Sequence, residues 1–220
     1  MPFVSTSPNT LGRTGLLQPA AATGMRDVVL LIGGGSNVGK TTAAAQLSAE
    51  LGAEHVEVDE LRGELDGRSG DPFAISNAWL RPVDELFECL VESTSRIADP
   101  LARLIDRHAA RGGAAIIEGQ GIEPSVLGLI DLGFDVRAVF VIEADRNRIE
   151  TTLRGRDSDG AARYRLLSPV EQQAVTTMNV RYGDWLQAEA KQHELAWVAS
   201  QPWPTLAHRI LEAAGIATRG

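Results

Sequence analysis

The sequence predicts an α/β fold in which helices cover both faces of a parallel sheet. Short apolar segments that are typical of buried strands alternate with helical segments along the chain. The 220 residues, 44% of them hydrophobic, suffice for one domain with a sizeable core. A glycine-rich segment also joins the first predicted strand to the first predicted helix. Strand connections of this kind are right-handed.

The first half of the chain predicts two strands, with a helix between them. Residues 27–32 (DVVLLI) are continuously apolar, as in a buried parallel strand. After three glycines, the Ala-rich segment 40–51 ends before Gly52, which predicts a helix. Alternating residues predict a strand at 55–58, and several glycines at 61–81 predict a loop with broken helical turns.

Two helices are predicted next. Pro82 opens a long helical pattern with one apolar face. The residues that share this face are Leu86, Leu90 and Ile97. Asp favours the N-cap and Pro the first helical position, so Asp99 and Pro100 predict a new or sharply kinked helix that runs to Arg111.

The second half continues the alternation. Residues 114–118 predict a short apolar strand that ends in Glu118 before a glycine. The remaining predicted elements are helical turns at 124–132, a strand at 136–142, a helix at 144–154, a loop at 154–165, a helix at 171–193, a strand at 195–199 and a helix at 205–214. The long helix is predicted to face the core with Val175, Met178, Tyr182, Trp185 and Leu186. Pro-Trp-Pro at 202–204 predicts a turn, not a recognition motif.

The charge and the amino-acid composition restrict the kinds of partner that the chain can bind. With 29 acidic and 21 basic side chains the formal charge is -8, so the chain lacks the general electrostatic footprint of a nucleic-acid-binding protein. Any bound anion must therefore be held by a local site. The four histidines show no metal-ligand motif. Only Lys40 and Lys191 are lysines.

Location is predicted from three features. No segment approaches the ~18 consecutive apolar residues of a membrane-spanning helix. The single cysteine, Cys89, cannot form an internal disulfide, which fits a reducing compartment. Residues 1–25 lack the basic start and apolar run of a secretory signal. We therefore expect a cytoplasmic protein with a flexible leader at 1–25 and one domain at 26–220.

The glycine-rich segment carries the strongest functional signal. GGSNVGKT at 34–41 satisfies the Walker A pattern G-x-x-x-x-G-K-[ST], and it lies between a predicted strand and helix, as phosphate binding requires. Its amide groups and the following helix end would hold phosphate. Lys40 would bridge the β- and γ-phosphates, and the Thr41 hydroxyl would bind Mg2+. The predicted nucleotide-binding residues are Gly34, Gly35, Ser36, Asn37, Val38, Gly39, Lys40, Thr41 and Thr42.

Other motifs restrict how this loop is used. A switch GTPase needs a guanine-reading N-K-x-D, but the second lysine, Lys191, stands in AKQH. The LSGGQ-like signature of transporter ATPases does not occur. A small-molecule or nucleotide kinase is the remaining common user of such a loop at this size.

Three segments resemble a known family. GGSNVGKTT at 34–42, VDELR at 58–62 and IIEGQGIEP at 116–124 are similar to the P-loop kinases of the adenylate-kinase-like group. The likeness is greatest to 2-phosphoglycerate kinase and its relatives, and lower to zeta toxins, chloramphenicol phosphotransferase and gluconate kinase. The resemblance covers residues 27–214. It implies a doubly wound P-loop NTPase-type sheet of five parallel strands in order 2-3-1-4-5, a short lid, ATP, Mg2+ and a small hydroxyl acceptor.

The resemblance also implies roles for two acidic residues. Asp59 follows the second strand, where an acid would orient the acceptor hydroxyl or take its proton. The alternative is an N-cap of the next helical turn. Glu118 stands at the Walker B position, where a carboxylate would hold Mg2+ through water or bond the acceptor, although Asp is commoner there.

Arginines supply the remaining candidates. Arg154 and Arg156 fall in the implied lid, where a guanidinium would neutralise charge on the transferred group, and Arg163 and Arg165 follow them as weaker candidates. The alternative is an exposed arginine-rich surface. Two further arginines could hold an acidic acceptor with paired hydrogen bonds or simply form surface ion pairs. These are Arg62 and Arg81.

The sequence therefore predicts an ATP-dependent phosphotransferase that moves the γ-phosphoryl group to a hydroxyl of a small molecule, with a phosphoglycerate-like hydroxy acid among the candidate acceptors. The alternative is a nucleotide-hydrolysing switch or an ATPase-coupled binding module, in which nothing is phosphorylated.

Overall fold

Five strands form the centre of the structure, a computed structural model that describes residues 28–58, 80–128, 136–155 and 164–217. The elements are β1 (Val29–Gly34), α1 (Lys40–Leu51), β2 (Glu54–Glu57), α3 (Val83–Ser95), α4 (Ala98–Arg111), β3 (Ala115–Glu118), α5 (Pro124–Leu127), β4 (Val136–Ile142), α6 (Arg146–Gly155), α8 (Pro169–Gln192), β5 (Ala196–Ala199), η3 (Trp203–Thr205) and α9 (Leu206–Ala213). The predicted leader and most of the predicted loop at 61–81 lie outside the described residues.

The sheet has the predicted order. Its strands lie in the sequence β2-β3-β1-β4-β5, and every neighbouring pair is parallel. β1 therefore lies in the middle, between β3 and β4. Because parallel strands end at one edge, the segment after β1 leaves the sheet at the centre of that edge, where doubly wound folds bind ligands.

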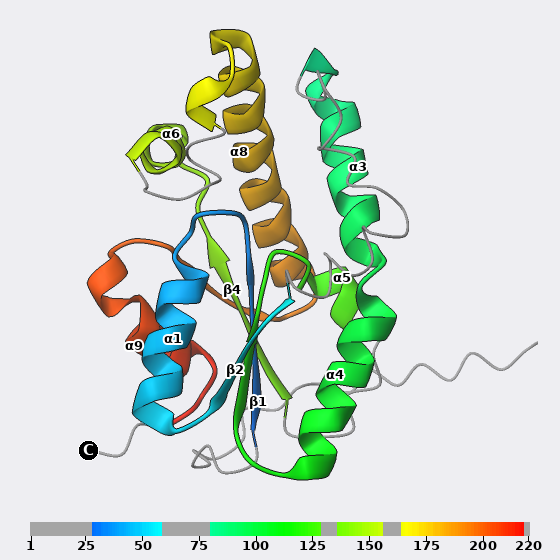
Figure 1. The fold of residues 1–220 in the computed structure, drawn as a ribbon, viewed down its shortest axis with the longest axis vertical. Helices are drawn as coiled ribbons and strands as arrows, with labels where there is room; N and C mark the ends of the chain where they lie inside the picture. The colour runs from blue at the N-terminus through cyan, green and yellow to red at the C-terminus, as the bar shows by residue number, and fades with distance from the viewer. Residues whose placement is uncertain (1–27, 59–79, 129–135, 156–163, 218–220) are drawn as a thin grey trace, which may run out of the picture.

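Helices cover both faces of this sheet, as Figure 1 shows. α1 and α9 lie on one face, whereas α3, α4 and α8 lie on the other. β1 contributes to both cores, because Leu31 packs with the helices of the larger face and Leu30 and Ile32 pack toward α1 and α9. All three side chains have 0% exposure. The strand that leads into the phosphate loop (residues 34–42) is therefore held from both sides.

The first strand runs further than predicted. It extends through Gly33 and Gly34, which pair with Phe140 and Val141 of β4. A Cβ atom at Gly33 would lie 2.4 Å from the Ile122 carbonyl oxygen, so only glycine fits this close approach. Two of the three glycines that were expected to follow the strand are therefore part of it.

The predicted N-cap of α4 is wrong by two residues. The helix begins at Ala98, with Ile97 at the N-cap, and the Leu101 amide donates to the Ile97 carbonyl over 2.8 Å. Ile97 has 0% exposure, so its packing fixes the start of the helix. Asp99 lies in the first turn, where its charge favours the helix N-terminus, and Pro100 needs no amide partner there.

Two boundaries near the predicted lid also differ. α6 begins at Arg146 rather than residue 144, because the Asp145 carboxylate accepts from the Arg148 amide over 2.9 Å, as an N-cap does. Of the predicted loop, Arg154 belongs to α6 and residues 164–166 are helical. Residues 156–163 lie outside the described ranges.

The long helix α8 starts with a reciprocal cap. The Ser168 hydroxyl accepts from the Glu171 amide, and the Glu171 carboxylate accepts from the Ser168 amide. The hydrogen bonds from the Ser168 side chain and backbone lower the pKa of Glu171. Further along, the predicted core residues are buried, except Trp185, which is half-buried and meets Phe87 edge-on at 5.7 Å.

Among the described residues, no helix combines the length and the apolar character that crossing a bilayer requires.

Candidate active site

The phosphate loop joins β1 to α1 through backbone angles that favour glycine. Gly34 and Gly39 have φ values of 143° and 97°, and Asn37 has a φ of 63°. A Cβ atom at Gly34 would lie 2.4 Å from the Val141 carbonyl oxygen. Gly39 is the N-cap of α1 and supplies no capping side chain. The N-terminal amides of α1 thus point into the loop, an arrangement that suits an anion.

Lys40 is buried within this loop. Its side chain is 8% exposed, and Nζ donates a 2.8 Å hydrogen bond to the Gly35 carbonyl oxygen. A buried ammonium group is costly unless it is hydrogen-bonded or paired with an anion. The loop therefore holds a positive charge at the point where the sequence predicts phosphate.

Thr41 and Glu118 meet beside the loop, as their predicted roles require. Glu118 ends β3, is paired in register with Ile32 of β1, and is 3% exposed. The Thr41 hydroxyl donates to Glu118 Oε1 over 2.8 Å. A hydroxyl and a carboxylate are oxygen ligands of the kind that Mg2+ prefers, and phosphate oxygens would complete such a site. These residues fit Mg2+.

The segment after β3 connects the phosphate loop to α8. Ser36 Oγ donates to the Gln120 side-chain oxygen over 2.9 Å. The Tyr182 hydroxyl lies 2.9 Å from the Gln120 carbonyl oxygen and 2.8 Å from Glu123 Oε1, so its one hydrogen is shared between these two acceptors. Glu123 has 0% exposure. The sequence predicted Tyr182 only as a core residue, because nothing local reveals the partner of its hydroxyl group.

The described residues include only part of the predicted acceptor and lid sites. Asp59, Arg62 and Arg156, and also Arg163, lie outside the described residues. Arg81 precedes α3 and is half-buried, and its Nη1 donates to Cys89 Sγ over 3.5 Å.

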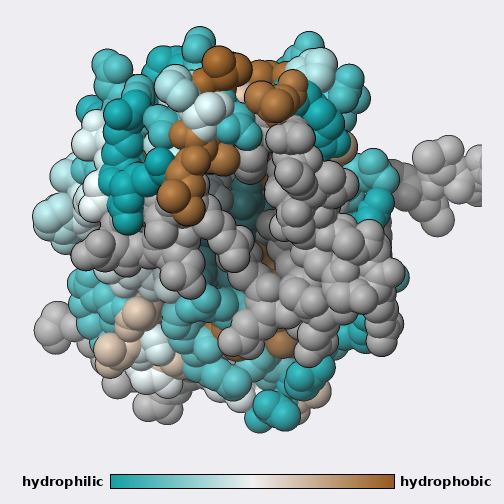
Figure 2. Space-filling view, turned by 45° about the horizontal axis from the view of Figure 1, so that its top comes forward, coloured by the Kyte–Doolittle hydropathy of each residue, from teal (hydrophilic) through white to brown (hydrophobic). Residues whose placement is uncertain are grey.

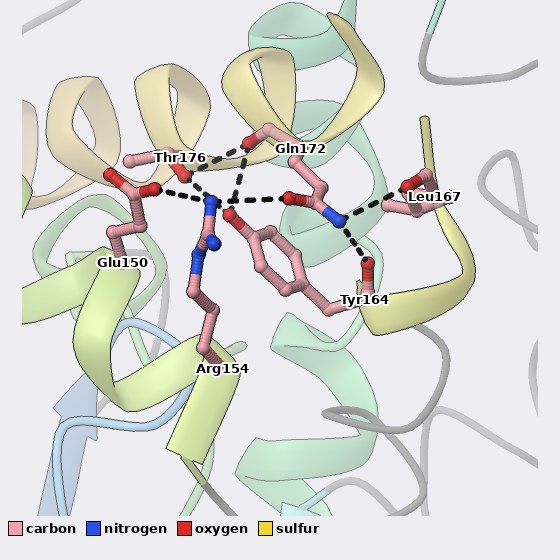
Figure 3. Close-up of polar contacts among 6 residues, drawn as sticks. All are labelled: Glu150, Arg154, Tyr164, Leu167, Gln172 and Thr176. Atoms are coloured by element: carbon pink, nitrogen blue, oxygen red, sulfur yellow. Dashed lines mark hydrogen bonds and ion pairs between the residues drawn. The ribbon is translucent and has the colours of Figure 1, made fainter. Parts of the chain in front are cut away.

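Arg154 lies in a polar network between α6 and α8. Its Nη2 donates to Glu150 Oε1 over 2.7 Å and to the Gln172 side-chain oxygen over 3.3 Å. Arg165 Nη1 in turn donates to the Arg154 carbonyl over 3.1 Å. Arg154 therefore joins α6 to α8, and its hydrogen-bond partners among the described residues lie outside the phosphate loop. Figure 3 shows its surroundings, which comprise Glu150, Tyr164, Leu167, Gln172 and Thr176.

A pocket of about 590 Å³ opens beside the phosphate loop. Its lining comes from α6 and from the segment after β5, and comprises Asn147, Arg148, Thr151, Thr152, Gln201, Pro202 and Trp203. A Cβ atom at Gly39 would lie 3.3 Å from Trp203 Cδ1, so the pocket wall touches the loop. Pro-Trp-Pro does form a turn, η3, but its tryptophan also lines this pocket. The sequence predicted only the turn, because the exposure of Trp203 and its position beside α6 come from tertiary packing.

An acidic residue orders one wall of this pocket. Glu143 follows β4, is 11% exposed, and lies 3.9 Å from Arg148 Nη1. Its Oε2 atom also accepts from the buried Ser200 hydroxyl. Glu143 therefore links the end of β4 to the segment after β5, and its negative charge attracts the Arg148 guanidinium.

Exposed apolar side chains gather at the same end of the molecule. Figure 2 shows apolar surface on either side of a hollow. Leu166, Val170 and Leu80 are 87%, 68% and 58% exposed. They lie near the starts of α8 and α3, which extend beyond the phosphate loop in Figure 1.

Comparisons with known proteins identify the fold. No protein-family model and no curated protein matches the chain. An unliganded sugar kinase from Janibacter sp. HTCC2649 is 17% identical, with a TM-score of 0.50, over 88% of this chain and 99% of its own. A gluconokinase from Sinorhizobium meliloti 1021 is 12% identical, with a TM-score of 0.49, and the match covers 87% of this chain and 93% of the gluconokinase. A shikimate kinase from Aquifex aeolicus is 17% identical, with a TM-score of 0.45, and the match covers 84% of this chain and 95% of the shikimate kinase.

At these identities the likeness shows the fold alone. The five-stranded, all-parallel sheet of order 2-3-1-4-5 is the P-loop kinase fold of the Janibacter sugar kinase. The predicted fold class is thereby confirmed.

Proposed function

We propose that this protein is an ATP- and Mg2+-dependent phosphotransferase that moves the γ-phosphoryl group to a hydroxyl of a small molecule. The observation that carries the proposal is the Thr41–Glu118 hydrogen bond beside a phosphate loop that buries Lys40. The P-loop kinase fold, shared with a sugar kinase, supports the same reaction class.

The phosphate loop would bind the triphosphate through its amides and the N-terminus of α1. Lys40 would exchange the Gly35 carbonyl for β- and γ-phosphate oxygens, which removes the cost of its buried charge. Thr41 and Glu118 would hold Mg2+, whose charge neutralises the phosphoryl oxygens. The chain's own contribution is then alignment and charge neutralisation in a fixed geometry.

The pocket beside the loop would take the nucleoside. Its volume of about 590 Å³ is in the range of small-molecule sites. The Trp203 ring is 46% exposed, so it offers an aromatic face for stacking, and the Arg148 guanidinium offers a second planar surface. Because Trp203 also approaches Gly39, a nucleotide could fill the pocket and the loop together.

For the acceptor side we propose the roles that the family resemblance implies. Asp59 orients the acceptor hydroxyl or takes its proton, and Arg62 and Arg81 bind an acidic group. A phosphoglycerate-like hydroxy acid is the first acceptor class to test, followed by sugars and sugar acids. The single free cysteine, Cys89, and the use of ATP favour the cytoplasm.

The arginines of the lid would complete the site. Arg154 is 59% exposed and is held by Glu150 and Gln172. It would have to exchange these partners to reach the transferred group, which calls for a closing movement of the lid. Arg156 is the second candidate for this role.

A panel of hydroxyl metabolites, incubated with protein, ATP and Mg2+, tests the proposal through acceptor-dependent ADP release and through the phosphorylated product. Lys40→Met should lower turnover by about 100-fold or more while the protein stays folded. The matched control is Lys191→Met, because Lys191 is the only other lysine and lies over the Trp197 ring on the surface. Full transfer by Lys40→Met would refute the proposal. Hydrolysis that needs no acceptor and responds to a protein partner would favour the nucleotide switch.

A further inference from the structure

Three potential metal ligands converge on strands β2 and β3. Glu57 is paired in register with Glu118, and His55 lies two residues before Glu57, so all three side chains share one face of the sheet. One ligand atom from each side chain lies within 4.8 Å of the other two. His55 Nε2 lies 3.9 Å from Glu118 Oε1.

The imidazole nitrogen of this group has no hydrogen bond to any residue that the structure describes. His55 Nε2 is buried and has no hydrogen-bond partner among the described residues, although the His55 side chain is 21% exposed. A buried polar atom is normally satisfied. Moreover, two glutamates whose carboxylates are close together repel each other when both are ionised. A bound cation would satisfy the nitrogen and relieve this repulsion.

We propose that His55, Glu57 and Glu118 bind a transition-metal ion of the Zn2+ type. One imidazole nitrogen and two carboxylate oxygens suit Zn2+, Mn2+ or Co2+, whereas Mg2+ prefers oxygen ligands throughout. Glu57 is exposed and Glu118 is buried, so the three ligands reach from the surface to the phosphate loop. Three protein ligands leave further coordination positions for water or another molecule.

The position of Glu118 gives this site a consequence. The same carboxylate accepts the Thr41 hydrogen bond, so a metal ion held by His55 and Glu57 would draw Glu118 away from Thr41. If the proposed function holds, Zn2+ therefore opposes the Mg2+-dependent reaction. The binding itself does not depend on that function.

Calorimetric titration of the full chain with Zn2+, without nucleotide, tests the site. We expect one ion per chain, and His55→Ala should weaken its binding by at least about tenfold. Glu57→Gln is the second variant, because the exposed side chain can be replaced without opening the core. The matched control is His193→Ala, whose exposed imidazole lies 3.6 Å from Glu189 on α8 and should not contribute.

Co2+ absorption gives a second readout, since the visible band of a bound ion should weaken in His55→Ala and Glu57→Gln but persist in His193→Ala. Folding of each variant is checked by circular dichroism. Failure of the wild-type chain to bind either ion at millimolar concentration overturns the proposal, as does equal binding by all variants. Loss of binding in the two site variants alone supports it. Absence of phosphoryl transfer would count against the proposed function and leave the binding result intact.

Discussion

The Thr41 hydroxyl donates to Glu118 Oε1 over 2.8 Å, although 77 positions separate the two residues in the sequence. The bond joins the first turn of α1 to the end of β3. Because Glu118 is 3% exposed and its strand is paired with β1, the loop and the acid are positioned together within the sheet. The site is in this respect preorganised, which is the property that phosphoryl transfer depends on.

Glu118→Gln should therefore impair Mg2+ use. Glutamine keeps an oxygen to accept from Thr41 but loses the negative charge that would help to hold the metal. We expect a higher Mg2+ requirement and a turnover lowered by about 100-fold. Initial rates across a Mg2+ series measure both, with Glu50→Gln on the exposed end of α1 as control. An unchanged Mg2+ dependence would remove Glu118 from the metal site.

Trp203→Ala should weaken nucleotide binding. The indole lines the pocket beside Gly39 and is 46% exposed, so its removal costs contact with the base and little core packing. Aromatic stacking on a base contributes about 1–3 kcal/mol, which corresponds to roughly a 5- to 160-fold increase in the dissociation constant of ATP. Calorimetry with ATP compares this variant with Trp197→Ala, a similarly exposed tryptophan on β5. Equal affinities would place the base elsewhere.

Tyr182→Phe should destabilise the fold. The lost hydroxyl shares its one hydrogen between the Gln120 carbonyl and the fully buried Glu123 carboxylate. Removing a donor from a buried carboxylate costs about 1–3 kcal/mol in the free energy of unfolding. Urea denaturation measures this, and Tyr164→Phe is the comparison, because that hydroxyl pairs with the neutral Thr176 hydroxyl. A loss no larger than that of Tyr164→Phe would contradict the expectation.

The cap of α8 predicts a pH dependence. The Ser168 hydrogen bonds lower the pKa of Glu171 in the folded protein, so the ionised carboxylate favours folding. This contribution is present above the ordinary glutamate pKa and is lost as the pH falls through the lowered value. Glu171→Gln should lower the melting temperature at pH 7, and the difference should narrow in acid. Thermal melts at pH 7 and below 4 check this, with the exposed Glu212→Gln as control. If the difference in melting temperature between the wild type and Glu171→Gln increased in acid, the lowered pKa of Glu171 could not be its cause.

The sequence predicted the strands and the phosphate loop because both follow from local patterns, whereas the strand order was implied by the family resemblance. An apolar run, a glycine loop and the helix at Lys40 stand next to one another in the chain. The pairing of Thr41 with Glu118 was foreseeable, because strand ends meet at one edge. The pocket was not, since Arg148 and Trp203 come from segments that only tertiary packing brings together. For the same reason, the sequence did not predict His55 as a metal ligand, because Glu118 lies on another strand.

The last helix does more than close the domain. Arg209 on α9 donates to the carbonyl oxygens of Ala199 and Pro202 over 2.5 and 3.0 Å, and its Nη2 reaches that of Ser200 at 3.4 Å. One side chain thus anchors the backbone that carries Trp203. Truncating the protein before this arginine would therefore release the wall of the pocket as well as uncover the core.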